Sequence, residues 1–283
     1  MDEPYPRLDR PPLSAVALRR ELLVPEGLYT AVDYRATTGS TNADAVAAAR
    51  GGAVEGLVVV ADEQTSGRGR LERAWSSPPR AGIAATVLLR PGEAVPDRGW
   101  PAIPLSGYAH LPLLAGVATV EALRRVAEVD AALKWPNDVL IDGRKCAGIL
   151  AETVPGPAGV PPAVVVGTGL NVTLRGPELP RADATSLLLA GASCVDREAL
   201  LSGVLHGFAG WYARWRAAAG DPVRSGLIDT YRFHCATIGA KVQLSLPGGS
   251  EIVDEVTGVA DDGSLLLAGR AVAAGDVIHL RQN

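Results

Sequence analysis

The sequence predicts an α/β fold followed by a small all-β region. From about residue 30 to residue 234, short apolar runs rich in β-branched residues alternate with helical segments rich in alanine and leucine, which is the pattern of a sheet flanked by helices. From residue 235 onward the pattern becomes strand-like. Hydrophobic residues make up 47% of the 283 residues and charged residues 20%, so the chain has enough apolar side chains to form a buried core.

The N-terminal part predicts one helix and then the first strands. Residues 1–29 hold a single helical pattern, Ala15 to Leu23, between two proline-containing stretches, and we interpret them as an N-terminal extension. The domain that follows, residues 30–234, contains three apolar runs that we expect to be strands: Gly56–Ala61, Ile83–Leu89 and Ala163–Val166.

Two longer helices are expected in this domain. Pro112–Val129 predicts a half-buried helix, because one side is apolar and the other carries Glu121, Arg124, Arg125 and Glu128. Asp196–Ala219 predicts a second helix, which follows a Ser193-x-x-Asp196 capping pattern and stops at Gly220. Its core-facing residues repeat at helical spacing and are Leu201, Val204, Leu205, Phe208, Trp211 and Trp215.

Residues 235–283 predict a small β-barrel. Val242, Leu244 and Leu246 alternate with polar residues, as in a strand with one buried face. Hairpin turns and further strands are expected at Pro247-Gly248-Gly249, Asp261-Asp262-Gly263, Leu265–Leu267 and Val277–Leu280. Acidic residues outnumber basic ones in this segment, so we do not expect it to bind nucleic acid.

Charge and cysteine content narrow the function classes. A net charge of -4 gives the chain no basic surplus for non-specific binding to nucleic acid. Three cysteines, Cys146, Cys194 and Cys235, are an odd number without CxxC spacing, which argues against a disulfide framework and a structural zinc site. No apolar run approaches the roughly 18 residues of a bilayer span, and the acidic, proline-rich start does not resemble a secretory signal. We expect a cytoplasmic protein that does not bind membranes.

The stretch from Asp62 to Trp75 is the first candidate for ligand chemistry. It directly follows an apolar strand and contains Gly67-Arg68-Gly69-Arg70, then Arg73 and Trp75. Glycine lets the backbone wrap closely around a ligand, and the arginine guanidinium is a fork-shaped donor suited to carboxylates and phosphates. One Gly-Arg pair would most simply be a flexible solvated loop. Two pairs and a third arginine favour a site for a carboxylate and a phosphate together.

The second candidate is a hairpin. Lys134-Trp135-Pro136-Asn137-Asp138 lies at a strand end, and a tight Asp142-Gly143 turn leads into a returning strand that Lys145 enters. We expect the hairpin to project Lys134, Asn137, Asp138 and Lys145 towards one cleft. Cys146 has no histidine near it in sequence to activate it, so we interpret it as a small core residue.

Two shorter motifs add polar groups. Gly167-Thr168-Gly169-Leu170-Asn171 is a glycine-rich strand end that presents an amide. Ser40-Thr41-Asn42 precedes an alanine-rich run, so it predicts a helix N-cap. Because helix N-termini also hold anions, capping and ligand binding are compatible at this position.

Taken together, these motifs resemble the biotin protein ligase family over about residues 35–190. Their order and spacing carry the resemblance, which also includes Lys145-x-x-Gly148-Ile149-Leu150 and Ala184-Thr185-Ser186-Leu187. One departure is Glu72, which stands where the loop commonly has a second glycine before Arg73. The resemblance implies a catalytic domain similar to class II aminoacyl-tRNA synthetases, a small C-terminal SH3-like barrel, and a monofunctional ligase without an N-terminal DNA-binding domain.

The resemblance also implies roles for individual residues. The ureido end of biotin would be bound by Ser40, Thr41, Asn42 and Gln64, and its carboxylate and adjoining phosphate by Arg68, Gly69, Arg70 and Lys145. Gly67 and Gly148 would also belong to the biotin site. ATP would be bound by Arg70, Arg73, Trp75, Lys134, Asn137, Asp138, Lys145 and Asn171. Lys145, Arg70 and Arg68 would be the catalytic residues, and no side chain is assigned as a ligand of a resident metal.

The expected reaction follows from the same resemblance. Biotin and ATP, with Mg²⁺, would form biotinyl-5'-AMP and pyrophosphate. The biotinyl group would then pass to a lysine in the biotin carboxyl carrier protein domain of a biotin-dependent carboxylase. We expect no DNA binding, and both a monomer and a weak dimer remain open.

Three alternatives compete with this hypothesis. A lipoate or octanoyl transferase has a related fold, but the arginine loop and the Ser-Thr-Asn triplet favour biotin. A biotin-responsive transcription regulator would need a DNA-binding domain, whereas about 29 residues precede the catalytic pattern. A P-loop NTPase is excluded because no GxxxxGK[ST] motif occurs.

Overall fold

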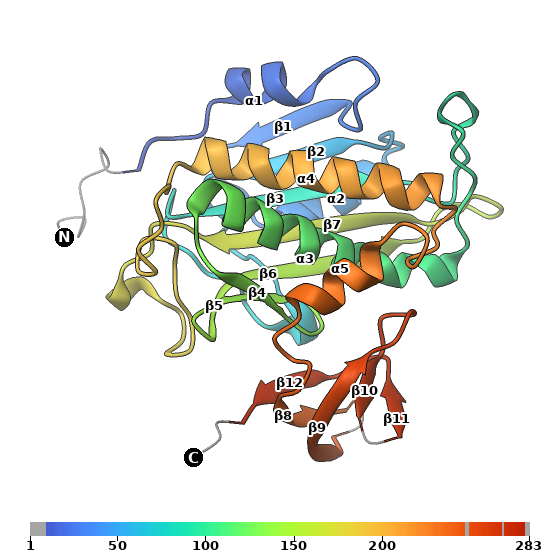
Figure 1. Ribbon diagram of the computed structural model, residues 1–283. Coiled ribbons are helices and arrows are strands. Elements are labelled where there is room, and N and C mark those ends of the chain that lie inside the picture. The colour runs from blue at the N-terminus through green and yellow to red at the C-terminus, as the bar shows by residue number, and fades with distance from the viewer. Residues whose placement is uncertain (1–9, 247–248, 268, 281–283) are drawn as a thin grey trace.

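Two sheets organise the chain (Figure 1). The computed structural model describes residues 10–246, 249–267 and 269–280. The larger sheet has seven strands in the order β1-β2-β3-β7-β6-β5-β4, and only β1 and β2 run parallel. Its strands are β1 Ala31–Arg35, β2 Leu57–Ala61, β3 Gly82–Leu89, β4 Ala131–Lys134, β5 Asp138–Ile141, β6 Arg144–Val154 and β7 Ala163–Asn171. The smaller sheet follows in the sequence, which confirms the prediction of an α/β region and a small β region.

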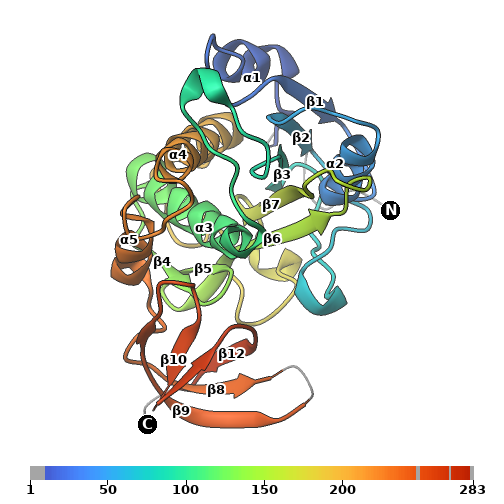
Figure 2. The ribbon, with the colours of Figure 1, turned by 90° about the vertical axis from the view of Figure 1, so that its right-hand side faces the viewer.

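Helices cover both faces of the large sheet (Figure 2). The helix α2 packs on one face, while α1, α3, α4 and α5 lie on the other side, where the larger hydrophobic core forms. Both faces of the central strands are therefore buried, which explains why they read as continuous apolar runs. The helices are α1 Ala15–Leu22, α2 Thr41–Arg50, α3 His110–Ala122, α4 Arg197–Ala217 and α5 Leu227–His234.

The prediction of a half-buried helix after Pro112 was wrong for most of its length. Every residue of α3 except Pro112 and Glu121 is buried. The cause is that α3 lies between the sheet on one side and α4 and α5 on the other, so it has packing partners all round. Arg124 and Arg125, which follow in a five-residue π-helical turn, are exposed as expected.

The capping pattern predicted for α4 was also wrong in detail. Asp196, not Ser193, is the N-cap, and its carboxylate accepts hydrogen bonds from the backbone N–H groups of Glu198 and Ala199. The Ser193 N–H donates instead to the Ala127 carbonyl at 3.0 Å. This bond ties the loop before α4 to the end of the π-helical turn that follows α3. The apolar stripe of α4 is buried as predicted, with Trp211 and Trp215 in the core.

The small sheet has five antiparallel strands in the order β11-β10-β9-β8-β12. Val242, Leu244 and Val277 fill its interior. The predicted turn at Asp261-Asp262-Gly263 is present, whereas Pro247 and Gly248 of the other predicted turn lie outside the described residues. The strands are β8 Lys241–Ser245, β9 Glu251–Val259, β10 Leu265–Leu267, β11 Arg270–Val272 and β12 Asp276–His279.

Hydrogen bonds fix the small sheet against the large one. The indole Nε1 of Trp135 donates to the Gly263 carbonyl at 2.9 Å, and the Arg232 guanidinium donates to the Val259 carbonyl at 2.8 Å. Thr237 Oγ1 accepts the Trp135 backbone N–H and lies 3.0 Å from His279 Nε2. The small sheet therefore has a defined orientation on the body of the protein.

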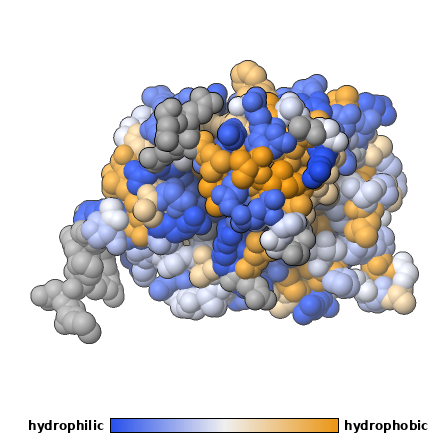
Figure 3. Space-filling view, turned by 90° about the horizontal axis from the view of Figure 1, so that it is seen from below, coloured by the Kyte–Doolittle hydropathy of each residue, from blue (hydrophilic) through white to orange (hydrophobic). Residues whose placement is uncertain are grey.

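The outer surface of the small sheet keeps some apolar character. This sheet lies at the bottom of Figure 1 and faces the viewer in Figure 3, where a hydrophobic area lies near the centre among hydrophilic residues. Val253 and Ile278 remain more than half exposed. Each pairs with Gln243 of β8, the strand between β9 and β12. Within the described residues, none of the helices combines the length and apolar composition of a membrane span.

A buried ion pair joins α4 to the large sheet, and hydrogen bonds to this pair hold the N-terminal segment in place. Asp62, directly after β2, lies 2.9 Å from the guanidinium of Arg197, the first residue of α4, and both side chains are almost fully buried. Arg197 also donates to the Pro11 and Gly82 carbonyls. Tyr34 donates its hydroxyl to Asp62 at 2.8 Å, and burial together with this bond raises the pKa of Tyr34 to about 12.

We predict that Asp62→Asn lowers the free energy of unfolding by about 3 kcal/mol, because it leaves the buried Arg197 without a counter-charge. Urea denaturation followed by tryptophan fluorescence measures the change. The matched control is Asp130→Asn, which removes the exposed partner of Arg124 and should change stability by less than about 1 kcal/mol. Equal effects of the two variants would contradict the role given to the buried pair.

Candidate active site

One cavity of about 300 Å³ opens on the α2 side of the large sheet. Segments far apart in the sequence form its walls: the start of α2, the arginine loop after β2, the β5–β6 hairpin, β7, and one residue of the small sheet, Asp276. The hairpin and the arginine loop therefore meet at one cavity, as the sequence predicted. The lining residues singled out from the sequence are Ser40, Thr41, Asn42, Gln64, Arg68, Gly69, Arg70, Arg73, Trp75, Asn137, Asp138, Lys145, Gly148 and Asn171.

Two of the residues singled out from the sequence do not line the cavity. Gly67 shapes the arginine loop: a Cβ there would lie 2.5 Å from the Trp75 carbonyl oxygen, and its own carbonyl accepts the Trp75 N–H. Lys134, at the end of β4, is the register partner of Asp138 and is close enough to Asp138 and Asp276 for their charges to act on it. Burial lowers the pKa of Lys134, and these carboxylates partly offset that effect.

The N-terminus of α2 supplies a polar end to the cavity. Ser40 caps the helix, accepting a hydrogen bond from Ala43, and so confirms the predicted N-cap. The Thr41 backbone N–H and hydroxyl both donate to Gln64 Oε1, at 2.8 and 3.0 Å. Because the amide oxygen of Gln64 is occupied in this way, its NH₂ group is the part left to donate to a ligand.

Asn42 is held by the protein itself. Its NH₂ group donates to the Leu150 carbonyl at 3.2 Å and to the Glu152 carboxylate at 2.6 Å, and its oxygen accepts from the Thr86 hydroxyl at 2.8 Å. A Cβ on Gly167 would lie 2.0 Å from this amide oxygen, so only glycine leaves room for it. Asn42 therefore fixes the wall of the cavity, while Thr41 and Gln64 offer the groups that face a ligand.

Trp75 lies against two neighbouring strands that carry no side chain beneath it. Gly148 of β6 and Gly169 of β7 are register partners. A Cβ on Gly169 would lie 2.5 Å from the indole ring, and one on Gly148 would lie 3.2 Å from it. The Lys145 ammonium lies 5.7 Å from the centre of the same ring. The paired glycines thus let the indole approach the backbone and form one side of the cavity.

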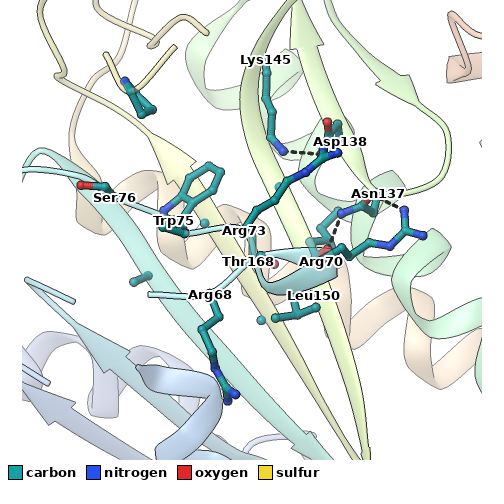
Figure 4. A pocket seen from close by; sticks show the side chains of 18 of the residues that line it. Arg68, Arg70, Arg73, Trp75, Ser76, Asn137, Asp138, Lys145, Leu150 and Thr168 are labelled. Carbon is teal, nitrogen blue, oxygen red and sulfur yellow. Dashed lines mark hydrogen bonds and ion pairs between the residues drawn. The ribbon is translucent and has the colours of Figure 1, made fainter. Parts of the chain in front are cut away.

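The arginine loop sends its three guanidinium groups in different directions (Figure 4). Arg68 points away from Lys145 and Asp138, is half exposed, and lies 3.6 Å from Glu152. Arg70 turns to the hairpin, donating to Asn137 Oδ1 at 3.1 Å. Arg73 extends to the side of the cavity that holds Lys145 and Asp138. Arg70 and Arg73 therefore share one end of the cavity, and Arg68 lies at another.

The hairpin completes this cationic end. The ammonium of Lys145 lies 2.6 Å from the Asp138 carboxylate. Asn137 is fixed by its NH₂ group, which donates to the Ile149 carbonyl at 2.7 Å. Four cationic side chains, Arg70, Arg73, Lys134 and Lys145, gather around two carboxylates, those of Asp138 and Asp276, which leaves an excess of two positive charges. A protein with a net charge of -4 thus holds a local anion site.

Asn171 contributes an unused acceptor. The residue is almost fully buried, lines the cavity, and donates its NH₂ group to the Thr185 carbonyl at 2.9 Å. Its Oδ1 atom accepts no hydrogen bond from the described residues. A buried acceptor without a partner is unfavourable, so this atom is suited to a donor group on a ligand.

The interpretation of Cys146 as a core residue is confirmed. It is fully buried, and burial raises the pKa of its thiol to about 12, so the thiolate needed of a nucleophile does not form at neutral pH. Within the described residues there is no cluster of three or more histidine, cysteine or acidic side chains suited to a metal ion.

The structure adds residues that the sequence did not single out. Thr86 and Glu152 hold Asn42 in place, and Asp276 forms an ion pair with Arg73 across 203 positions of the chain. The segment with Ala184 and Thr185 runs beside Lys145 at the start of β6. The Ala-Thr-Ser-Leu motif therefore reaches the cavity, which Ala184 lines. Glu72 lies in the loop, but its side chain is not among those described.

Comparisons with known proteins agree with this arrangement. The sequence model of the Biotin/lipoate A/B protein ligase family matches residues 50–171. The biotin–[acetyl-CoA-carboxylase] ligase of Mycobacterium tuberculosis is 40% identical over 96% of this chain and 97% of the relative. The bifunctional ligase/repressor BirA of Bacillus spizizenii is 33% identical over 83% of this chain and 68% of the relative.

A solved structure agrees as well. The biotin protein ligase of Aquifex aeolicus in complex with biotin and ATP is similar in fold, with a TM-score of 0.69 and 25% sequence identity, over 90% of this chain and all of the other. With a relative at 40% identity along almost its whole length, this chain belongs to the biotin protein ligase family.

Proposed function

We propose that this protein is an ATP-dependent biotin protein ligase. It forms biotinyl-5'-AMP from biotin and ATP, and then transfers the biotinyl group to a lysine of a biotin carboxyl carrier protein domain. The observation that carries the proposal is the convergence of the arginine loop and the lysine strand on one cavity whose other end is the polar start of α2. The relatives named as biotin ligases and the ligase structure that contains biotin and ATP support the same substrates.

Biotin fits the two ends of the cavity. Its ureido group would meet the Gln64 NH₂ group and the hydroxyl groups of Ser40 and Thr41, which Gln64 and the helix start hold in place. Its carboxylate would then reach the cationic end formed by Arg70, Arg73 and Lys145. Because the walls between are strand backbone and the Trp75 ring, the apolar middle of the ligand would contact nonpolar surface.

The first reaction brings two anions together. A biotin carboxylate oxygen attacks the α-phosphorus of ATP, the new P–O bond forms, and the bond to the pyrophosphate oxygen breaks. Charge repulsion and misalignment make up much of the barrier, and fixed cations in a partly dry cavity lower both. The Lys145 ammonium, steadied by Asp138 and the Trp75 ring, is the group best placed to hold the carboxylate and the α-phosphate together.

The adenine end would use Asn171. The donors that ATP offers are its exocyclic amine and its ribose hydroxyls, and the unpaired Asn171 Oδ1 is an acceptor at the cavity wall. We assign this atom to the exocyclic amine. Mg²⁺ would enter with the triphosphate, held by phosphate oxygens and by the oxygens of Asp138 and Asn137, which are the hard donors that this ion prefers. It would neutralise charge on the leaving pyrophosphate.

Transfer requires that the adenylate stays bound until an acceptor arrives. The mixed anhydride is prone to hydrolysis, and the arginine loop, which lines the cavity, would shield it from water by closing over it. An acceptor lysine amine then attacks the carbonyl carbon, and AMP leaves. We propose that this takes place in the cytoplasm, in keeping with the three cysteines, none of which forms a disulfide.

The deciding experiment is an incubation with labelled ATP, Mg²⁺ and biotin, followed by addition of a biotin carrier domain. Pyrophosphate release that depends on biotin, and then label transfer to the carrier domain, are expected. Replacing biotin with lipoate separates the proposal from a lipoate ligase, and activity with lipoate alone would overturn it.

We predict that Lys145→Ala lowers biotin-dependent pyrophosphate release by at least about 100-fold, because it removes a preorganised charge from the reacting groups. A pyrophosphate-coupled assay measures the rate. Arg144→Ala is the matched control, since this exposed neighbour is also cationic but does not line the cavity. Full adenylation by the Lys145 variant would refute the role.

We predict that Arg70→Gly shortens the lifetime of the bound adenylate by roughly ten-fold, because it removes a charged hydrogen-bond donor from the loop. Escaping adenylate should then label an unrelated lysine-rich protein added to the mixture. The lifetime is measured by trapping labelled adenylate with excess unlabelled biotin. An unchanged lifetime, with no labelling of the bystander, would count against this role of the loop.

We predict that the wild-type protein prefers ATP to inosine triphosphate, which carries a carbonyl in place of the exocyclic amine, by about ten-fold in kcat/KM. Asn171→Ala should reduce this preference to near one while leaving the affinity for biotin unchanged. Steady-state kinetics with both nucleotides and calorimetry with biotin test the two parts. A preserved nucleotide preference in the variant would mean that Asn171 does not contact the amine.

A further inference from the structure

The small C-terminal sheet reaches the cavity at one place. Among the described residues from β8 to the C-terminus, Asp276 alone lines the cavity, and it begins β12 just after Gly275. The rest of the small sheet is fixed elsewhere, through Trp135 and Arg232. The contact at Asp276 is therefore additional to those that hold the two sheets together.

Both arginines at the cationic end are attached to this point. The Arg73 guanidinium forms a short ion pair with the Asp276 carboxylate. Arg70 donates from Nη2 to the Gly275 carbonyl at 3.3 Å and from Nη1 to Asn137 Oδ1 at 3.1 Å. The tip of the arginine loop is thus held between the body of the protein and the small sheet.

Backbone hydrogen bonds from Gly69 to Arg73 and from Arg73 to Arg70 close the loop tip, but its exposed side chains add little packing. Leu71, between the two arginines, has a left-handed backbone with φ 53°, which is unfavourable for a residue with a Cβ atom. Its side chain is 70% exposed, so it contributes no packing that would stabilise this conformation. The contacts of Arg70 and Arg73 with the small sheet are therefore the side-chain contacts that tie this strained tip to another part of the fold.

Asp276 is well supported as an anchor. It pairs with Ser245 of β8 in the ladder of the small sheet. Gly275 packs so closely on β8 that a Cβ would lie 2.6 Å from the Leu244 side chain. Burial disfavours the charged carboxylate, but the hydrogen bond and charge of Arg73, with the charges of Lys134 and Arg70, outweigh burial and hold the pKa of Asp276 below its ordinary value.

We propose that Asp276 is a positioning residue for adenylate formation: it holds Arg73 at the phosphate end of the cavity and, with the Gly275 carbonyl, keeps the loop tip closed. The small sheet is then part of the catalytic apparatus. This inference rests on the proposed ligase function. The opposite role, a counter-ion that competes with ATP phosphates for Arg73, predicts an effect of opposite sign, so one variant decides between them.

The test is Asp276→Asn in the full chain, which keeps the shape of the side chain and removes its charge. We expect KM for ATP in biotin-dependent pyrophosphate release to rise about five-fold, in line with a partly exposed ion pair, and the bound adenylate to escape faster. Asp276→Glu should recover most of the loss. A lower KM for ATP, or no change in KM and adenylate lifetime, would overturn the proposal.

A matched control uses another acid of the same sheet. Glu255→Gln removes one exposed negative charge from β9, away from the cavity, and should leave both quantities unchanged. Arg73→Gln tests the pair from the loop side, and the double variant with Asp276→Asn should be no worse than Arg73→Gln alone. Additive losses would show that the two residues act separately. If Asp276→Asn is poorly folded, Arg73→Gln alone still decides the question, because it removes the same ion pair from the loop side.

The wild-type protein separates this inference from the function on which it rests. If wild type releases no pyrophosphate with biotin and ATP, the ligase proposal fails. If wild type is active and Asp276→Asn behaves like Glu255→Gln, the ligase proposal stands and the role of Asp276 is wrong.

Discussion

The absence of side chains at three positions of two neighbouring strands is the constraint on which the site depends. Gly148 and Gly169 leave the space in which Trp75 lies, and Gly167 leaves the space for the Asn42 amide. Larger residues would push both groups into the volume where a ligand binds. The strands remain fully hydrogen-bonded, so the floor of the cavity is rigid although it lacks side chains. The charged groups are then positioned above a fixed surface.

The charged side chains of the site are arranged around these two strands. Cations from the loop and the hairpin lie at one end of the cavity, and each has a polar partner. Lys145 pairs with Asp138 and Arg73 with Asp276, while Arg70 donates a hydrogen bond to the Asn137 amide oxygen. A net positive charge remains for anionic substrates. Because these partners belong to different segments, the arrangement exists only in the folded chain.

The parts of the site that could be predicted are formed by residues close together in the sequence. The glycine-arginine loop, the lysine hairpin and the Ser40 cap are contiguous motifs, and the family resemblance that they carry was enough to predict that the loop and the hairpin share one site. Asp276, Glu152 and Thr86 could not be found in this way, because their partners lie 44 to 203 positions away. The error at α3 has a similar origin: periodicity describes one helix, whereas burial depends on the neighbouring helices α4 and α5, which cover α3 on the side away from the sheet.

The hydrophobic cores on the two faces of the large sheet differ in size, which affects which part of the native state can open locally. The core beneath α2 consists of small residues, chiefly alanine and valine, whereas the opposite core contains four of the five tryptophans. Because α2 buries little apolar area, its local release costs less hydrophobic free energy than an opening of the main core. Such an excursion would remove Thr41 from Gln64 while the main core stayed closed. Amide hydrogen exchange at α2 would reveal it, whereas fluorescence dominated by the other core would not.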